Sequence, residues 1–565
     1  MQTRKKGTAF SRLILAITLV ISSLIVGWAT IGFTTDFDLA RTPEFQAIVF
    51  VGMLLLTSFS ISFARGSLKL MRLESLTRVK TRAFSAFSVI FIILSGFTIG
   101  LLAQKVYIGT IRNGTGYNDG PWSTWHTDPC NSITITWLTA SPNAMVLHYG
   151  TNPALLDQVY NDATLVNLHK AISLNLLPNT TYYYRIPETF STPHASTTFT
   201  FHTAASNLDQ FRFAVLGDKQ PTDAHLLESN GFVADGIIAQ NYDFVCQVGD
   251  LASSGTDVLD WHKTLDSLAR IGATAPLLMA IGNHDWDGLE GAANWRQLFS
   301  YPWAGTEAAS FYSLDYGNAH FVMLDNFELF YRMSAGQLAW IVKDITSAKA
   351  RGATWIFCLF HLSIFTTATS GMLEDLQRLL VPVFDQLPVD AVFFGHDHDY
   401  EHYNYTYGAN NLVYSPDHTW NHHSVQYFVT GGGANLEVDY GVLTMKPTTY
   451  DVEWYNLTTS NYETIQYEQR PWNQSRYVTN LGFPRNYTQY SDTGEYDGKY
   501  FYHAPAIESY FDFAPTIGLT YGEQAYHFMD VQVNGNQCVI RALYPNGDVM
   551  KGPGDAFPQI YVLQK

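Results

Sequence analysis

Side chains that can bind metal ions follow five short apolar runs between residues 211 and 398. The runs are rich in Val, Ile, Phe and Leu, which is typical of buried strands. The polar residues at their ends are Asp218, Asp250, Asn283 with His284, His361, and His396 with His398. Carboxylate, amide and imidazole groups are donors for hard and borderline metal ions. The pattern therefore predicts that these residues gather around metal.

The segments between the first three runs have helical patterns. One extends over about Asp223 to Gln240. The other places Val258, Trp261, Leu265, Leu268 and Ile271 on one helix face. Alternating strands and helices predict a parallel sheet, in which the carboxyl ends of the strands share one edge. Because open α/β sheets bind ligands at that edge, we expect the five polar ends to meet in one crevice.

Each polar end has an ordinary structural explanation when it is taken alone. A Gly-Asp pair after a strand often forms a turn or caps a helix, and a histidine among apolar residues is more often a hydrogen-bonded core residue than a ligand. The succession GD, GD, GNHD, a strand-end His and GHDH is harder to explain as five separate caps.

With these motifs the chain resembles the calcineurin-like metallophosphoesterases and, within them, the purple acid phosphatase branch. The resemblance extends over most of residues 110–435 and part of the C-terminus, and the GNHD and GHDH elements make it specific. It implies an α/β fold in which a β-sandwich is flanked by helices. It also implies two metal ions with these ligands: Asp218, Asp250 and His398 for the first, and Asn283, His361, His396 and the shared Asp250 for the second.

The chemistry implied by this resemblance is phosphate ester hydrolysis. Two ions about 3.5 to 4 Å apart can generate a hydroxide at neutral pH, which attacks phosphorus in line with the leaving oxygen. His284 would stay off the metals, face the phosphate and give a proton to that oxygen, so His284 and Asp250 are the expected catalytic residues. The donors fit Fe, Mn or Zn alike.

Three positions depart from the pattern of the branch. Ser253 stands where purple acid phosphatases have the tyrosine that ligates ferric iron, so we expect no purple colour. Gln220 occupies the place of a ligating histidine in many wider relatives, and His402 replaces an arginine of the purple branch. Gln220 and His402 are therefore further candidates for contact with metal or substrate, although a plain hydrogen-bonding role is an alternative for Gln220.

The charge of the chain is distributed unevenly. Residues 1–108 contain 12 Lys and Arg against 4 Asp and Glu, a net of +8, whereas the remainder contains 21 against 46, a net of −25. Nucleic-acid binding needs a basic surface, so we expect no nucleic-acid partner for the acidic body of the chain.

Three apolar stretches without charged residues fill the N-terminal part: Leu13–Phe33, Gln46–Ala64 and Ala83–Gln104. Each is near the roughly 20 residues that a helix needs to cross a bilayer. Four basic residues precede the first stretch and six separate the second from the third, whereas the first loop has only Arg41. By the positive-inside rule, this pattern predicts a multi-pass protein of the cell membrane with an extracellular catalytic domain. A cleaved signal peptide and a soluble helical hairpin are the alternatives.

Glycosylation and disulfides are weaker expectations. The sequons at Asn113, Asn179, Asn404, Asn456, Asn473 and Asn486 are candidates for glycosylation, although the composition alone would produce most of them. Cys246 and Cys358 lie in expected strands and are interpreted as core thiols, which leaves Cys130 and Cys538 as a candidate pair.

The expected domains are a membrane domain (1–108), a fibronectin-like domain (109–205), the catalytic domain (206–435), an insertion (436–515) and a C-terminal part of the catalytic domain (516–565). Alternating short strands predict the fibronectin-like β-sandwich, which also resembles the N-terminal domain of purple acid phosphatases. The insertion contains twelve tyrosines. It is either an ordered surface loop or a lid or contact surface for glycans or other copies of the chain.

Taken together, the sequence predicts a membrane-anchored extracellular enzyme that hydrolyses phosphomonoesters through a metal-bound hydroxide. Phosphodiester or nucleotide hydrolysis at the same site is the alternative within this class. A surface structural or adhesion protein that keeps the fold without turnover is the alternative from another class, and a membrane sensor is a third. The expected partners are a phosphate ester and the lipid bilayer.

Overall fold

The computed structural model describes residues 116–172, 176–186, 197–221, 224–286, 292–304, 310–328, 333–366, 373–405, 425–433, 449–456, 461–468, 495–496, 499–500, 519–523, 525–551 and 558–565. Nearly all of them belong to one compact unit, made of residues 114–255, 259–286 and 291–565. The following description concerns this unit.

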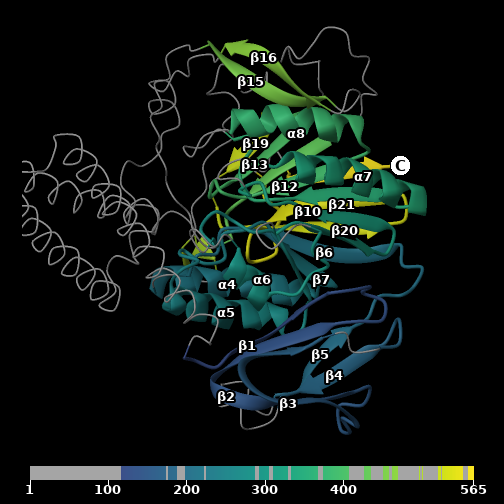
Figure 1. Cartoon of the computed structure of the whole chain (residues 1–565), viewed down its shortest axis with the longest axis vertical. Coiled ribbons are helices and arrows are strands. Elements are labelled where there is room, and N and C mark those ends of the chain that lie inside the picture. The colour runs from purple at the N-terminus through teal and green to yellow at the C-terminus, as the bar shows by residue number, and fades with distance from the viewer. Residues whose placement is uncertain are drawn as a thin grey trace, which may run out of the picture. The chain divides into compact units, whose positions relative to one another are not determined.

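Two mixed β-sheets form the centre of the unit (Figure 1). The six-stranded sheet has the order β22 (Ile560–Gln564), β21 (Gln537–Leu543), β20 (Phe528–Asn534), β6 (Gln210–Leu216), β7 (Phe244–Gln247) and β8 (Leu277–Met279). The seven-stranded sheet has the order β19 (Leu519–Glu523), β13 (Tyr400–Tyr405), β14 (Val425–Thr430), β12 (Ala391–Phe394), β11 (Trp355–Leu359), β10 (Ala319–Met323) and β9 (Tyr312–Tyr316).

The two sheets pack together through aromatic side chains. The Phe213 ring on β6 meets Phe321 on β10 at 5.1 Å and Phe357 on β11 at 5.4 Å, both edge to face. Strands β11 and β12 are completely buried, which explains their nearly continuous apolar sequences. Burial of these rings therefore stabilises the contact between the two sheets.

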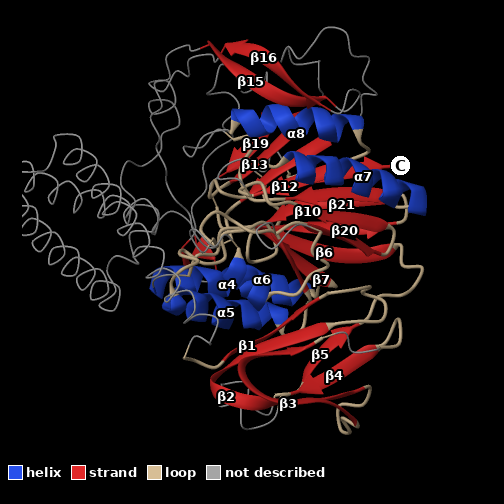
Figure 2. Ribbon diagram, viewed as in Figure 1, coloured by secondary structure: helices blue, strands red, loops and turns tan. Residues whose placement is uncertain are grey.

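Helices cover the outer faces of the sheets (Figure 2). They are α4 (Ala224–Gln240), α5 (Val258–Gly272), α6 (Ala293–Leu298), α7 (Ala335–Arg351) and α8 (Glu374–Gln386). Helix α7 buries Leu338, Ile341 and Ile345 in the core that it shares with the seven-stranded sheet. It begins after Ser334, whose hydroxyl accepts a hydrogen bond from the Gln337 N–H, as expected for an N-cap.

The polar strand ends come from two sheets rather than from one. Strands β6, β7 and β8 are parallel, as the alternation of strands and helices predicted. Strands β11 and β12, however, belong to the second sheet, because the β9–β10 hairpin begins a new parallel series after β8. The predicted single sheet edge is therefore replaced by the facing edges of two sheets.

A separate five-stranded antiparallel sheet precedes this core. It contains β1 (Asp119–Thr124), β2 (Thr134–Gly150), β3 (Gln158–Ala171), β4 (Thr181–Arg185) and β5 (Phe199–His202). β2 is long because its pairing with β3 continues across two register shifts. β1 lies within the expected fibronectin-like domain (109–205). The Ser123 hydroxyl donates to the Gly272 carbonyl at 2.7 Å, which links this sheet to the end of α5.

The expected insertion at 436–515 is described only in part. Its described strands are β15 (Thr449–Asn456) with β16 (Asn461–Glu468), and β17 (Glu495–Tyr496) with β18 (Lys499–Tyr500), each an antiparallel pair. β15 lies beside α8 (Figure 1). All twelve tyrosines lie outside the described residues or in strands of which only the backbone is described.

The predicted location in the cell membrane is corrected. Within residues 116–565, as far as they are described, no helix is long and apolar enough to cross a bilayer. The three apolar stretches Leu13–Phe33, Gln46–Ala64 and Ala83–Gln104 lie outside the described residues. The candidate disulfide is also wrong, because Cys130 and Cys538 are free thiols. Cys538 is buried in β21, while the Cys130 thiol contacts the Ala205 carbonyl.

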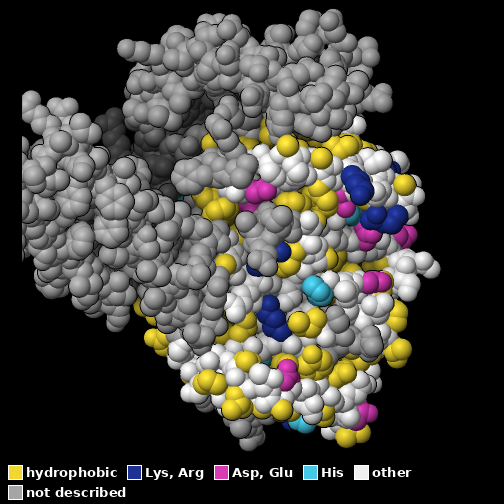
Figure 3. Space-filling model, in the orientation of Figure 1, with side chains coloured by type: hydrophobic (Ala, Val, Ile, Leu, Met, Phe, Trp, Pro, Cys, Tyr) yellow, Lys and Arg dark blue, Asp and Glu magenta, His cyan; other side chains and the backbone are white. Residues whose placement is uncertain are grey.

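The surface of the described part is mixed in character. Figure 3 shows acidic and basic side chains interspersed with hydrophobic ones on one face. Single exposed apolar side chains, such as Leu165 at 68% exposure, are ordinary on protein surfaces.

A buried histidine joins α7 to the seven-stranded sheet. His320 on β10 is 1% exposed, and its Nδ1 and Nε2 lie 2.5 Å and 2.8 Å from carboxylate oxygens of Asp315 and Asp344. Arg351 pairs with the other side of Asp315 at 2.8 Å. Burial alone would lower the pKa of His320, but the hydrogen bonds to both carboxylates outweigh it and raise the pKa. When the ring is protonated, both nitrogens donate, one to each carboxylate.

We expect His320→Gln to lower the free energy of unfolding by about 2 kcal/mol at pH 6, because a hydrogen-bonded charge is lost. The pKa of His320 is higher in the folded than in the unfolded chain. Its contribution to the free energy of unfolding is therefore complete below the unfolded pKa of about 6.5, and it is lost as pH rises through the folded pKa. Urea denaturation at pH 6 and pH 9 should thus show a smaller effect at pH 9. Ser347→Ala on α7 is the control, and an effect of the same size at both pH values would contradict the prediction.

Candidate metal centre

The predicted site residues stand on strained backbone at the strand ends. Asp218 follows β6, Asp250 follows β7 and His396 follows β12, with φ of 57°, 51° and 74°. Gln220 has a φ of 36°. These are four of the six non-glycine residues with positive φ in the described part of the chain. Such backbone costs of order 1 kcal/mol or more per residue and concentrates at functional sites.

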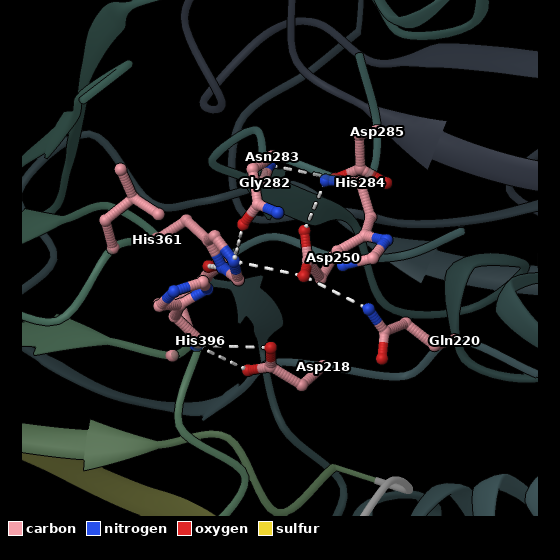
Figure 4. A network of polar contacts seen from close by, with 12 residues as sticks. Asp218, Gln220, Asp250, Gly282, Asn283, His284, Asp285, His361 and His396 are labelled. Atoms are coloured by element: carbon pink, nitrogen blue, oxygen red, sulfur yellow. Dashed lines mark hydrogen bonds and ion pairs between the residues drawn. The ribbon is translucent and has the colours of Figure 1, made fainter. Parts of the chain in front are cut away.

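Asp250 lies at the middle of the site (Figure 4). Its Oδ1 accepts from the His284 N–H at 3.0 Å. Its Oδ2 lies 3.1 Å from Gln220 Nε2 and 3.1 Å from His361 Nε2. The side chain is 2% exposed. Asp250 therefore contacts residues of the first, third and fourth polar strand ends.

The first and fifth strand ends meet at Asp218. Both carboxylate oxygens accept from the His396 N–H, each at 3.1 Å. His398 places its Nε2 3.4 Å from Asp218 Oδ1. Asp218 is completely buried, so its carboxylate faces only the protein interior and this neighbouring histidine.

The third and fourth strand ends meet at His361. Its Nδ1 lies 2.9 Å from the Val248 carbonyl, to which it donates, and this contact turns Nε2 toward the site. Nε2 lies 3.0 Å from the Asn283 Oδ1. In the described part of the chain, Asp250, His361 and His396 form a group whose potential ligand atoms all lie within 4.8 Å of one another.

This arrangement fits metal ions. Carboxylate, amide and imidazole donors converge within hydrogen-bond distance in a buried place, as expected of side chains that can share a cation. His361 has its outer nitrogen on a carbonyl, which is the usual support for a histidine ligand. The structure therefore brings together all six expected ligands, and their binding of metal stays a prediction.

The electrostatics of the site reflect its burial. Burial raises the pKa of Asp218. Burial would also raise the pKa of Asp250, but the charges of His361 and His284 outweigh it and lower the pKa. Burial would lower the pKa of His361, but the charge of Asp250 raises it to about 9. Burial and the nearby positive charge of His361 lower the pKa of His396 to about 3. Hydrogen bonds and ion pairs link these groups within the cluster.

Two glycines allow the strand ends to approach closely. A Cβ on Gly395 would overlap with Asp218 Oδ2, and one on Gly282 would overlap with Asp250 Oδ1. The Gly in GHDH and the Gly in GNHD are thus required by the close approach of a backbone to a carboxylate.

His284 has the position expected for a residue next to the metals. It is half-buried, and its Nδ1 lies 2.8 Å from the Ser253 carbonyl. Ser253 therefore contributes a backbone oxygen that orients His284. Gln220 directs its amide nitrogen at Asp250, which supports the hydrogen-bonding alternative.

His402 lies away from this cluster. It is 1% exposed in β13, and its Nε2 lies 2.9 Å from Gln426 Oε1. Its ring lies 3.7 Å from that of Tyr561, a residue of the other sheet. These contacts place His402 in the packing between the two sheets.

Among the sequons, Asn179 and Asn404 are exposed. Only the backbone of Asn456 is described, and Asn113, Asn473 and Asn486 lie outside the described residues.

Asp285 supports the site, although sequence reasoning assigned it no role. Its Oδ1 accepts from the N–H groups of Leu251 and Ala252 at 2.9 Å and 3.0 Å, and its Oδ2 accepts from Gly282 at 2.9 Å. Burial and the negative charge of Asp250 raise its pKa to about 7. The sequence does contain a signal for this role, namely the Asp at the end of the GNHD motif. A buried carboxylate at that position can accept hydrogen bonds from backbone N–H groups of neighbouring loops.

Comparisons with known proteins agree with this geometry. Residues 211–400 match the family model described as calcineurin-like phosphoesterase. This part of the chain is therefore similar to the calcineurin-like phosphoesterases, which supports a metal-dependent phosphoesterase as the class of the protein.

Within the superfamily, similarity to purple acid phosphatases supports a purple acid phosphatase-like branch. The chain is 24% identical over 350 residues to a phosphoenolpyruvate phosphatase of Allium cepa. The matched region is 54% of this chain and 67% of that protein. It is 25% identical over 325 residues to purple acid phosphatase 21 of Arabidopsis thaliana. Here the matched region is 54% of this chain and 69% of that protein.

A solved structure confirms the fold. A purple acid phosphatase from yellow lupin (Lupinus luteus) seeds has a TM-score of 0.51 at 16% identity, covering 79% of this chain and 74% of the lupin chain. The recognition made from the motifs and the expected calcineurin-like α/β fold are both confirmed.

Asp285→Asn should loosen the loops that carry Asp250 and Asn283. The amide offers one acceptor and two donors to three N–H groups, so at least one buried N–H loses its partner. We expect a loss of about 2 kcal/mol in the free energy of unfolding by urea denaturation. Asp266→Asn, an exposed change on α5, should have little effect. Equal stability of the two variants would contradict the proposed support role.

Proposed function

We propose that this chain hydrolyses phosphomonoesters at a centre of two metal ions. The proposed ligands are Asp218, Asp250 and His398 for one ion, and Asn283, His361, His396 and the bridging Asp250 for the other. One observation carries the proposal, namely the position of Asp250 between the other strand ends. Its carboxylate is near enough to both groups of donors to be shared.

The metal ions, Asn283 and His284 would have different roles in the reaction. When bound, the metal ions would acidify a water molecule and neutralise charge on the phosphate. Asn283 is uncharged, so the two aspartates are the only negative charges among the six ligands. His284 donates from Nδ1 to Ser253, which leaves Nε2 to hold a phosphate oxygen or to pass a proton to the leaving oxygen.

Resemblance to the purple acid phosphatase branch favours monoesters as substrates. The relative from Allium cepa is named for a phosphomonoester, phosphoenolpyruvate, which supports the same choice. Phosphodiester hydrolysis is the alternative that the test below distinguishes.

We further propose the domain limits 109–205, 206–435, 436–515 and 516–565, with the first domain a fibronectin-like spacer. The sheet of β1 to β5 supports a separate β domain, and its bond from Ser123 to Gly272 supports a structural role. The insertion at 436–515 is proposed as a contact surface for glycans or other copies of the chain.

Asp250→Asn tests the metal centre. The purified full chain should contain about two metal ions, Fe, Mn or Zn, by elemental analysis and hydrolyse a chromogenic phosphomonoester faster than a diester. In the variant, kcat/KM should fall by more than the roughly 10- to 100-fold cost of losing an outer-shell partner. Asp266→Asn is the matched control on the surface. Full turnover by Asp250→Asn would exclude this site, and preference for the diester would select the alternative.

Removal of metal should destabilise the wild-type chain. At a free metal concentration about 100 times Kd, binding to the folded state contributes about 2.7 kcal/mol. Dialysis against a chelator should therefore lower Tm, and added metal should restore it. In Asp250→Asn, Tm should respond much less. A Tm that is unchanged by chelation in the wild type would argue against a bound centre.

A further inference from the structure

The loop that carries His361 is held from behind by the side chain of Asn326. This residue follows β10 and is completely buried. Its Nδ2 donates to the Leu362 carbonyl at 3.0 Å, and its Oδ1 accepts from the Leu362 N–H at 3.1 Å. Leu362 is the residue directly after His361. Both backbone groups of that residue are thus bound by a single side-chain amide.

This contact extends the pairing of β10 with β11. The last backbone hydrogen bond between them joins the Leu324 N–H to the Leu359 carbonyl at 2.8 Å. Beyond it, the chain after β10 supplies a side-chain amide to Leu362. An amide presents one acceptor and donor hydrogens much as a peptide group does, so Asn326 can replace a strand partner where the strand has ended.

A second amide holds the first in place. Gln337 on α7 is completely buried, and its Oε1 accepts from the Asp325 N–H at 2.9 Å. Its Nε2 donates to the Asp325 carbonyl at 2.9 Å. Helix α7 therefore fixes the backbone of Asp325, and the next residue, Asn326, fixes the backbone that follows His361.

The remaining contacts of the loop act on His361 from other sides. The Gly395 N–H donates to the His361 carbonyl at 3.0 Å, and the Ser363 hydroxyl donates to the Gly395 carbonyl at 2.5 Å. These bonds tie the loop to the strand end of His396. Bonds from Leu373 and Gln377 also reach Ser363 and Ile364. The bond from Asn326 connects the residue directly after His361 to the chain segment held by α7.

We propose that Asn326 is a positioning residue for His361, and that Gln337 supports it. The inference rests on the proposed function, because it assigns the two amides the role of holding a metal ligand. The backbone on both sides of His361 is fixed, so the ring can keep its Nδ1 on the Val248 carbonyl and its Nε2 toward Asp250 and Asn283. Loss of the amide would let this ligand move, which weakens the ion that it binds.

The test is a titration of the full metal-free chain with Zn²⁺ in competition with a chelator. Asn326→Ala should weaken Zn²⁺ binding at one of the two sites by roughly 10- to 100-fold and leave the other unchanged, as loss of an outer-shell partner of one ligand does. Gln337→Ala should give a smaller loss. Ile345→Ala, a core change on the same helix, should lower Tm without changing Zn²⁺ binding at either site. If Asn326→Ala does not fold, Asn326→Asp, which keeps an acceptor for Leu362, should give an intermediate loss.

A double-mutant comparison separates positioning from general loosening. In a His361→Ala background, Asn326→Ala should have no further effect on Zn²⁺ binding. Two results would overturn the inference if the wild type binds two ions. One is normal Zn²⁺ binding by Asn326→Ala alone. The other is that Asn326→Ala weakens Zn²⁺ binding as much in the His361→Ala background as in the wild type. A wild-type chain that binds no metal would instead overturn the proposed function together with this inference.

Discussion

The structure depends on the burial of one carboxylate, that of Asp250, among donors from several strand ends. A buried ionised carboxylate is costly unless hydrogen bonds and positive charge compensate for it. Here the compensation comes from the His284 N–H, the Gln220 amide and His361. Because each partner stands on a different loop, the carboxylate is satisfied only when those loops are all in place. The site and the local fold therefore form together.

The two sheets supply the rigidity that such a site needs. The strands that precede Asp250 and His361 are completely buried, and their aromatic side chains interlock across the sandwich. Strained backbone at the strand ends is tolerated because these strands define where each loop begins and ends. Outside the sandwich, Gln337 on α7 holds Asp325, and the neighbouring Asn326 holds the backbone after His361. The donors are thus positioned from both faces of the seven-stranded sheet.

Much of this could be predicted from local sequence. The motifs identified the residues that converge, and the alternation of strands and helices predicted the parallel order of β6, β7 and β8. The division between two sheets could not be predicted from periodicity, because a buried parallel strand has the same apolar sequence in either sheet. The amide contacts of Asn326 and Gln337 were also invisible, since no spacing rule relates residues whose contact depends on tertiary packing. His402 was suggested by its proximity to GHDH in the sequence, whereas its ring contacts Gln426 and Tyr561.

The position of β20 has a consequence for how the chain folds during synthesis. β6 carries Asp218 at its end and pairs on one side with β7, but on the other side with β20, which begins at Phe528. A ribosome makes β6, β7 and β8 long before it makes this partner. Until then, one edge of the incomplete sheet has unpaired N–H and carbonyl groups, which is a template for wrong pairing. Closing the sheet brings together residues about three hundred positions apart, a non-local step of the kind that slows folding.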